Sequence, residues 1–202
     1  MDAIRDFIGG DEDNQGYLPL GLAMNTDGGA GFDVLRMPGS RDDVHLEFVD
    51  NHLELTQLSD GAMFSIKNAE MIAFDNNETV VIAHNQTEGI LARLVHSFFN
   101  RDATAAEWQL GRETLQQPYD PDAILDWFQQ RAGLQDLPDT DYVQTIYTQT
   151  LGRSATGDEL DLQLSRLESN QIDRNWLPVE IAQSSEAVTH LIGSVLLQDG
   201  WV

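Results

Sequence analysis

Cysteine is absent from the 202-residue sequence, lysine occurs once, at Lys67, and there is no long apolar run. The lack of cysteine excludes disulfide bonds, a thiol nucleophile and metal sites built from thiolates. No apolar run approaches the ~18 residues of a transmembrane helix, so we expect no insertion into a membrane. Residues 1–13 lack the basic and apolar regions of a cleavable signal peptide. This fits a cytosolic protein, a fragment, or a protein exported by another route.

Positive charge is scarce. Lysine and arginine together number 11 against 34 acidic residues, which gives a formal net charge of −23 at pH 7. A nucleic-acid-binding protein needs a basic surface, and so does a protein that docks on an anionic membrane, so neither partner is expected. Surplus carboxylates repel one another, and high salt, bound divalent cations or a basic partner relieves that repulsion. An acidic surface that only confers solubility is the plain alternative.

Sequence motifs of common catalytic sites are also missing. The chain has no G-x-S-x-G, no H-E-x-x-H, no Walker A loop and no G-x-G-x-x-G before a helix. Its five histidines are scattered, and its carboxylates are too many for one acid–base pair to stand out. We therefore expect no enzyme and assign no catalytic residue. A carbohydrate-active enzyme, or an accessory unit of one, is the alternative.

The hydrophobic pattern divides the chain into two parts, which predicts an α+β fold. Residues 1–84 form a β-rich segment, because apolar and polar residues alternate along 44–49 and 53–56. Turn residues separate these runs, which favours antiparallel hairpins. Further strands are expected at 62–67, 69–74 and 78–83.

Residues 85–202 are predicted to form an all-α domain, because their apolar residues recur at helical spacing. Asp120 followed by Pro121 is typical of a helix start. Helices are expected near 87–100, 104–116, 121–131, 139–151, 156–169, 174–183 and 185–198.

The helical part repeats itself. Arg153 follows Arg101 by 52 residues, and a Thr-x-x-Glu capping box follows each arginine. We expect two related units, at about 87–131 and 139–183, with a helix after them. Each arginine is expected to hold its loop or pair with a carboxylate, and a ligand site is the alternative. The tryptophans Trp108, Trp127 and Trp176 are expected in the core or between helices, and a platform for sugars is the alternative.

One motif carries a specific chemistry. Residues 28–36 (GGAGFDVLR) match G-G-x-G-x-D-x-U-x, the nonapeptide of the calcium-binding parallel β-roll, in which Leu35 is the apolar position that points inward. Glycines bring backbone carbonyls together, and calcium prefers oxygen ligands. Residues 9–14 (GGDEDN) are predicted to form a degenerate partner turn, with Glu12 in place of glycine and Asn14 in place of aspartate. An ordinary glycine-rich loop is the alternative. The candidate calcium ligands are Asp33, Asp27, Gly29, Gly31, Asp11, Asp13 and Asn14.

This nonapeptide resembles the repeats-in-toxin (RTX) signature, and residues 31–83 resemble the β segment that often follows RTX repeats. The resemblance implies a bacterial protein that is secreted or displayed at the cell surface. It also implies calcium binding and export by type I secretion machinery, which reads an uncleaved C-terminal signal. Only one nonapeptide is intact, so no long calcium roll is expected. The matching residues in the β segment are 39–43 (GSRDD) and 69–76 (AEMIAFDN).

Residues 139–190 resemble the helical domain of unknown function DUF4214, and residues 90–131 resemble a weaker copy of it. The match is carried by Tyr142-Val143, Ile146-Tyr147, Leu151-Gly152-Arg153 and residues 181–186 (IAQSSE). This resemblance implies no catalytic residues.

The leading functional hypothesis is a non-catalytic, calcium-assisted module of a type I-secreted RTX-like protein. It would act in cell-surface adhesion or ligand binding, or in secretion and folding. A peptide, a glycan and another protein are all open as ligands. Besides this hypothesis and the carbohydrate-active alternative given above, a third hypothesis is a scaffold that assembles partners through its helical repeats without calcium.

Overall fold

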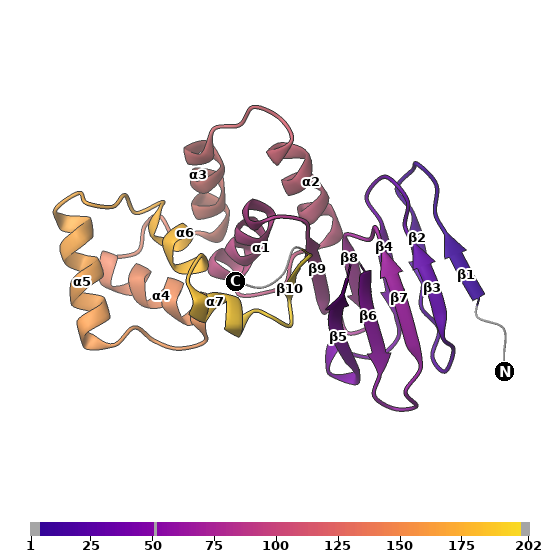
Figure 1. Cartoon of the computed structure of the whole chain (residues 1–202). Helices are drawn as coiled ribbons and strands as arrows, with labels where there is room; N and C mark the ends of the chain where they lie inside the picture. Colours follow the sequence, from indigo (N-terminus) through magenta and orange to yellow (C-terminus); the bar gives the residue numbers. More distant parts are fainter. Residues whose placement is uncertain (1–4, 51, 199–202) are drawn as a thin grey trace. The chain divides into compact units, whose positions relative to one another are not determined.

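The computed structural model describes residues 5–50 and 52–198 and confirms an α+β chain, with a β-rich N-terminal part followed by helices (Figure 1). The chain divides into two compact units. The roll unit comprises residues 1–86, 104–109 and 193–202, and the helical unit comprises 87–103 and 110–192. The roll unit is therefore assembled from three separate pieces of the sequence.

Two five-stranded sheets make up the roll unit. Sheet A has the order β1-β3-β7-β6-β5, and sheet B has the order β10-β9-β8-β4-β2. The strands of sheet A are β1 (Arg5–Ile8), β3 (Met24–Asp27), β7 (Met63–Lys67), β6 (His52–Gln57) and β5 (Val44–Val49). Those of sheet B are β10 (Val195–Leu197), β9 (Thr79–Ala83), β8 (Met71–Phe74), β4 (Val34–Met37) and β2 (Gln15–Tyr17). A 3₁₀ turn, η1 (Arg41–Asp43), precedes β5.

The first four strands form a parallel roll. The chain passes from β1 in sheet A to β2 in sheet B, returns to β3 in sheet A and continues to β4 in sheet B. Strands β1 and β3 pair in parallel, as do β2 and β4, and stacked residues are 19 positions apart. Strands β7 and β8 add a third layer beside β3 and β4. The predicted glycine-rich turn is thus part of a parallel β-roll whose successive strands alternate between the two sheets.

The later strands follow the expected hairpins. Strand β6 pairs antiparallel with both β5 and β7, and β8 pairs antiparallel with β9. Asp50 and Asn77 take positive φ angles of 55° and 65° at the tight turns. Both residue types tolerate this conformation better than most, which explains their use there.

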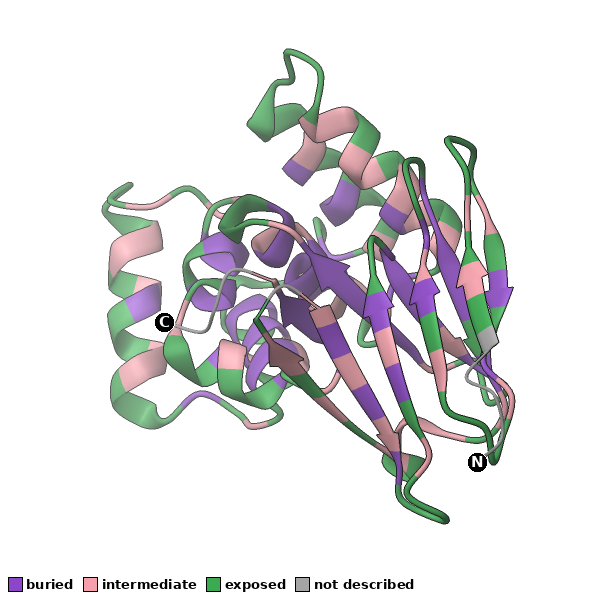
Figure 2. Ribbon diagram, turned by 45° about the vertical axis from the view of Figure 1, so that its right-hand side comes forward, coloured by how far each residue is buried: buried purple, intermediate pink, exposed green. Residues whose placement is uncertain are grey.

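The hydrophobic core of the roll unit lies between the two sheets, and Figure 2 shows buried residues alternating with more exposed ones along several strands. Leu35, which the nonapeptide motif predicted to point inward, is 1% exposed and belongs to this core. The core residues are Leu18, Leu35, Met37, Leu53, Leu55, Phe64, Ile66, Ala69, Ile72, Phe74, Val80, Ile82 and Leu196.

The helices agree closely with the sequence prediction. In the helical unit, α1 is joined to later helices by buried contacts: Phe98 stacks on Phe128 with ring centroids 5.2 Å apart, and the Thr150 hydroxyl donates to Ser97 Oγ at 2.7 Å. The helices are α1 (Gln86–Phe99), α2 (Ala105–Leu115), α3 (Pro121–Ala132), α4 (Asp139–Leu151), α5 (Gly157–Glu168), α6 (Leu177–Ala182) and α7 (Ser185–His190).

The end of the helical prediction is wrong. A helix was expected over 185–198, but α7 ends at His190, and Val195–Leu197 form β10, which pairs in parallel with β9. The apolar run that follows Gly193 suits a short buried strand as well as a helix, so periodicity alone does not separate the two. Pairing with β9 selects the strand.

Candidate functional site

Two glycine-rich turns lie in register at one end of the roll. Turn I (residues 9–14) and turn II (residues 28–33) are joined by backbone hydrogen bonds, including Ala30 N to Gly10 O at 2.9 Å. Gly29 has a φ of +92°, and a Cβ placed on it would lie 2.2 Å from Gly10 O. Glycine is therefore required there for both conformation and space. The degenerate upstream turn that the sequence suggested does stack on the intact motif.

Asp33, the acidic residue of the motif, is buried between these turns at 1% exposure. Its Oδ1 accepts a hydrogen bond from Asn14 N at 2.8 Å. Its Oδ2 is buried and has no hydrogen-bond partner among the described residues. Burial raises the pKa of the Asp33 carboxyl above its ordinary value, the hydrogen bonds from Asn14 act in the opposite direction, and the nearby charges of Asp13 and Asp27 raise it further. A carboxylate in this position lacks a compensating positive charge.

The unpartnered oxygen lies beside a backbone carbonyl. A Cβ placed on Gly28 would be 2.7 Å from Asp33 Oδ2 and 2.0 Å from Asn68 O. A carboxylate oxygen and a carbonyl oxygen therefore both approach the bare Cα of Gly28. This donor set is of the kind that calcium prefers. Within the described ranges, no group of three or more acidic, histidine or cysteine side chains could hold a metal ion. Any cation here would depend on backbone carbonyls as well.

Two other predicted ligands, Asp13 and Asp27, already accept hydrogen bonds within the roll. Asp13 Oδ1 accepts from Phe32 N at 2.9 Å, and its Oδ2 accepts from Gln109 Nε2 at 2.9 Å. Asp27 Oδ1 accepts from Gly29 N at 3.1 Å and from Asn68 Nδ2 at 2.8 Å. These groups hold the turns in register.

Three further predicted ligands have different surroundings. The Asn14 side-chain amide donates to the carbonyl of Glu12. Gly31 packs on the backbone of Glu12 and Asp13 in turn I. Asp11 is exposed, and its carboxylate makes no hydrogen bond or ion pair with a described residue. The structure thus brings Asp33, Asn14 and Asp13 together but leaves Asp11 at the surface.

Two residues of the third layer were not predicted. Glu70 is buried, and its Oε2 accepts from Asp33 N at 2.7 Å. Asn68 contributes both its carbonyl beside Gly28 and its amide to Asp27. Asn68 has a φ of 50°, so it takes a left-handed conformation without a glycine in the sequence to indicate a turn. Residues 69–76 matched only the β segment that follows RTX repeats, and no spacing pattern placed Asn68 or Glu70 beside the nonapeptide.

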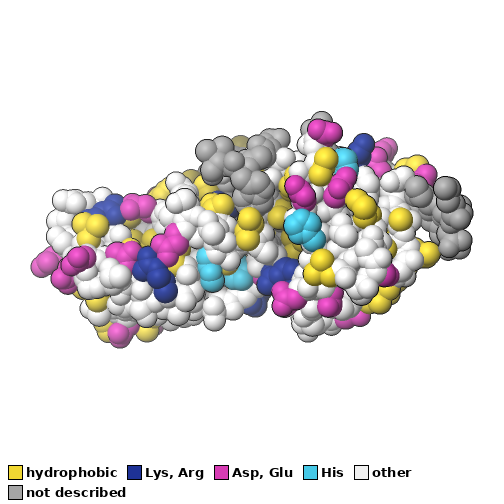
Figure 3. All heavy atoms as spheres, turned by 60° about the horizontal axis from the view of Figure 1, so that its bottom comes forward, with side chains coloured by type: hydrophobic (Ala, Val, Ile, Leu, Met, Phe, Trp, Pro, Cys, Tyr) yellow, Lys and Arg dark blue, Asp and Glu magenta, His cyan; other side chains and the backbone are white. Residues whose placement is uncertain are grey.

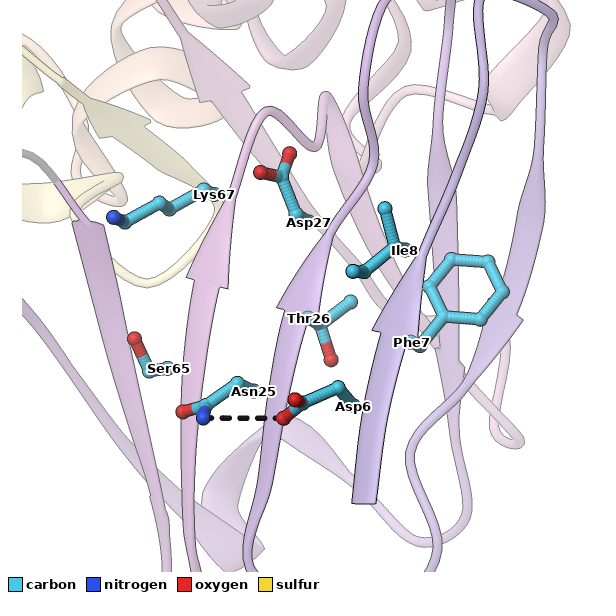
Figure 4. Close-up of a pocket in the computed structure, with 8 residues that line it drawn as sticks. All are labelled: Asp6, Phe7, Ile8, Asn25, Thr26, Asp27, Ser65 and Lys67. Carbon is cyan, nitrogen blue, oxygen red and sulfur yellow. Dashed lines mark hydrogen bonds between the residues drawn. The ribbon is translucent and has the colours of Figure 1, made fainter. Parts of the chain in front are cut away.

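A polar hollow lies on the outer face of sheet A, next to the glycine turns. Its volume is about 380 Å³, at the lower end of the range for ligand pockets. Figure 4 shows side chains from β1, β3 and β7 around it, and Asp27 belongs both to the hollow and to the entry of turn II. The outward-facing residues of the hollow are Asp6, Ile8, Asn25, Asp27, Ser65 and Lys67.

The repeated arginines were expected to have structural roles, and Arg153 confirms this. Its Nη1 and Nη2 each donate to a Glu159 oxygen at 2.8 Å, while Nε and Nη2 donate to the carboxylate of Glu186. Arg153 therefore ties the start of α5 to α7. Arg101 donates to the carbonyl of Asp102 and lies over the Phe99 ring.

Replacing Arg153 by methionine should lower the melting temperature by roughly 2–4 °C at neutral pH, because it removes two partly exposed bidentate contacts. Hydrogen bonds from Arg153 lower the pKa of Glu159 to about 2, from an ordinary 4.5. A carboxyl with a lowered pKa stabilises the fold above its unfolded pKa and loses this effect as the pH falls toward the folded value. The deficit of the variant should therefore shrink between pH 6 and pH 3 in thermal unfolding.

Arg131→Met is the matched control, because Arg131 lies over the Trp127 ring and makes no ion pair with a described residue. Its effect should not depend on pH in this range. An Arg153→Met deficit that is the same at both pH values would contradict the role of the Glu159 pair.

Comparison with known families supports part of the sequence-based resemblance. The family model described as "Domain of unknown function (DUF4214)" matches residues 126–191. The region from within α3 through α7 is therefore similar to DUF4214 domains, as expected from its motifs. No curated protein and no solved structure matches the chain. Among the described residues, no helix is both long and apolar enough to cross a membrane.

Proposed function

We propose that this chain is a non-catalytic, calcium-assisted module of a bacterial protein that leaves the cell by a type I system. It would act outside the cell or at its surface, in adhesion and ligand binding or in secretion and folding. The observation that carries the proposal is the buried, unpartnered Oδ2 of Asp33, beside the Asn68 carbonyl between stacked glycine turns. The likeness of turn II to the RTX nonapeptide supports the same proposal.

Calcium would supply the positive charge that the Asp33 site lacks. Asp33 Oδ2 and the Asn68 carbonyl would be its ligands, together with carbonyl oxygens of the glycine turns. The negative charges of Asp13 and Asp27 lie near enough to raise the pKa of Asp33, so they would also increase the attraction for a cation. Magnesium fits less well, because it demands a near-ideal octahedral site and gives up its water reluctantly.

The overall charge supports a role for calcium in export. The chain carries a formal net charge of −23, and Figure 3 shows acidic side chains spread over the face in view. Where calcium is scarce, as in the cytosol, repulsion would keep the glycine turns loosely folded. Calcium outside the cell would bind only the folded turns and shift the equilibrium toward them.

The test is thermal unfolding in EDTA, in 5 mM calcium and in 5 mM magnesium. For a site with a Kd of about 50 µM, 5 mM calcium should stabilise the fold by about 2.7 kcal/mol. For a chain of this size, this corresponds to a rise of roughly 5–10 °C in melting temperature. Magnesium should have little effect. If calcium and magnesium act equally, or calcium has no effect, the proposal is wrong.

Asp33→Asn keeps the size of the side chain and an oxygen for the Asn14 hydrogen bond, so it should fold and lose the calcium-dependent rise. Asp75→Asn is the matched control. It removes the same charge from an exposed turn away from the glycine turns and should keep the full rise. A calcium response that survives in Asp33→Asn would show that the ion binds elsewhere.

A further inference from the structure

We propose that the polar hollow on the outer face of sheet A binds an uncharged, polyhydroxylated ligand, a glycan chain that lies across β1, β3 and β7. The inference concerns a surface distinct from the Asp33 site, and it does not require that site to hold a cation. Its basis is the register of three strands, which places hydrogen-bonding groups of different kinds side by side.

The register brings two rows of side chains to one face. Asp6 pairs with Asn25 and Asn25 with Ser65, while Asp27 pairs with Lys67 in the neighbouring row. Residues two apart on a strand point to the same side, so both rows face outward. Figure 4 shows Asp6, Asn25 and Ser65 pointing the same way, with Phe7 turned to the opposite side.

The rows offer both donors and acceptors. Within the hollow, Asn25 Nδ2 donates to Asp6 Oδ1 at 3.2 Å, which leaves the Asn25 carbonyl and the second Asp6 oxygen available. The side chains of Ser65 and Lys67 make no hydrogen bond or ion pair with a described residue. The single lysine of the chain therefore presents its ammonium group, unpaired, in a hollow that also holds carboxylates, an amide and a hydroxyl.

This mixture favours sugar hydroxyls over other ligands. A hydroxyl both donates and accepts, so it can use carboxylate, amide and ammonium partners at once. Two carboxylates against one ammonium disfavour a polyanion, and the lysine makes the hollow a poor site for a simple cation. Ile8, 77% exposed at the edge strand, offers an apolar contact for the C–H face of a sugar ring.

The same face is long enough for several sugar units. The row that contains Asp6, Asn25 and Ser65 continues across the sheet. Ser65 is followed in register by Glu54 on β6 and Glu47 on β5. Neighbouring strands are about 4.8 Å apart, so the row spans roughly 19 Å over five strands. A ligand that follows this row would run across the strands rather than along them.

The test is electrophoresis of the folded full chain through native gels that contain dextran, mannan, xylan or a mixed-linkage β-glucan, each in EDTA and in calcium. At least one polysaccharide should retard the protein, and the corresponding oligosaccharide should shift the backbone amide NMR signals of β1, β3 and β7. Asn25→Ala and Lys67→Met should each weaken binding by about tenfold, because each removes a hydrogen-bonding group from the hollow.

Sheet B supplies matched controls. Gln15→Ala and Arg36→Met make comparable changes at exposed strand positions of that sheet and should leave the retardation unchanged. The inference is overturned if no polysaccharide retards the protein, if the control variants lose binding equally, or if the shifted signals lie outside sheet A. A further gel contains polylysine. Retardation by polylysine and by none of the polysaccharides would also overturn the inference, since that would show only non-specific attraction to acidic groups.

The calcium proposal and the glycan inference can fail separately. If a polysaccharide retards the protein in EDTA and calcium has no effect on the melting temperature, glycan binding in the hollow is supported and the calcium site is rejected. A calcium-dependent rise in melting temperature without retardation by any polysaccharide would do the reverse.

Discussion

Trp108→Ala is expected to lower the free energy of unfolding by about 3–5 kcal/mol, the usual cost of truncating a buried aromatic residue. Trp108 is 1% exposed, and its indole Nε1 donates to the Glu70 carbonyl at 3.1 Å. The variant would leave a cavity in the roll unit and remove one of two hydrogen bonds to the Glu70 carbonyl, which also accepts from Ile82 N at 2.9 Å. Urea unfolding followed by circular dichroism measures the loss.

Trp127→Ala is the matched control for this result. Trp127 is 46% exposed and packs edge-on against Phe128, with ring centroids 5.3 Å apart. Its removal should cost about 1 kcal/mol or less, because much of the ring is already in water. Similar losses in the two variants would mean that Trp108 does not pack in the core as described. Trp108→Phe, which keeps most of the packing and removes only the indole donor, should lie between them.

Gly28→Ala should destabilise the roll unit by about 3 kcal/mol, the upper part of the usual range for overpacking. Its Cβ would stand 2.0 Å from the Asn68 carbonyl oxygen, a backbone atom that cannot move without shifting the third layer of the roll. The same methyl group would approach Asp33 Oδ2 at 2.7 Å. Thermal unfolding in EDTA measures this effect free of any contribution from calcium.

Gly10→Ala serves as the comparison, because it makes the same chemical change in turn I. No described atom lies within 4 Å of the added Cβ, and Gly10 does not have a left-handed φ. Alanine should therefore be neutral or stabilise by up to about 1 kcal/mol, through its lower entropy in the unfolded chain. A large loss at Gly10, or none at Gly28, would contradict the tight stacking of the two turns.

Local pattern was sufficient for strands β5 to β9 and for helices α1 to α6, but not for the segment from α7 to β10. Leu53 and Leu55 alternate with polar residues because β6 has one face in the core, and period-two patterns report this arrangement directly. The capping box at Thr156 and Glu159 likewise marks the start of α5, and both of its hydrogen bonds are formed. Where one element buries one face, the sequence carries enough information to locate it.

The early strands could not be predicted in the same way. Strand β3 has the sequence Met-Asn-Thr-Asp and only one strongly apolar residue. It is a strand because β1 and β7 pair with it on both sides, so its conformation depends on the stacked layers rather than on its own preference. The glycine motif located the turn but did not indicate that strands β1, β2 and β3 form a parallel roll around it.

The candidate site was predicted only in part, because some of its residues come from other layers of the roll. Asp33 and the glycines were found from their spacing, whereas Asn68 and Glu70 come from a layer that follows the inserted hairpin β5–β6. The hollow depends on register between β1, β3 and β7, which no single segment encodes. Trp108 was expected in the core or in helix packing, and it is buried, but the sequence did not indicate that its segment belongs to the roll unit or that its indole donates to the Glu70 carbonyl.

The position of β10 has a consequence for the order in which the roll unit can fold. Val195 pairs with Val81, and every residue of β9 is buried. A chain that emerges from a ribosome or a secretion channel exposes β9 long before its neighbour arrives, since the intervening helices must come first. Until then, β9 has an open, apolar edge that could pair with another chain. Completion of sheet B is therefore a late, non-local step, and we expect it to limit the rate of folding.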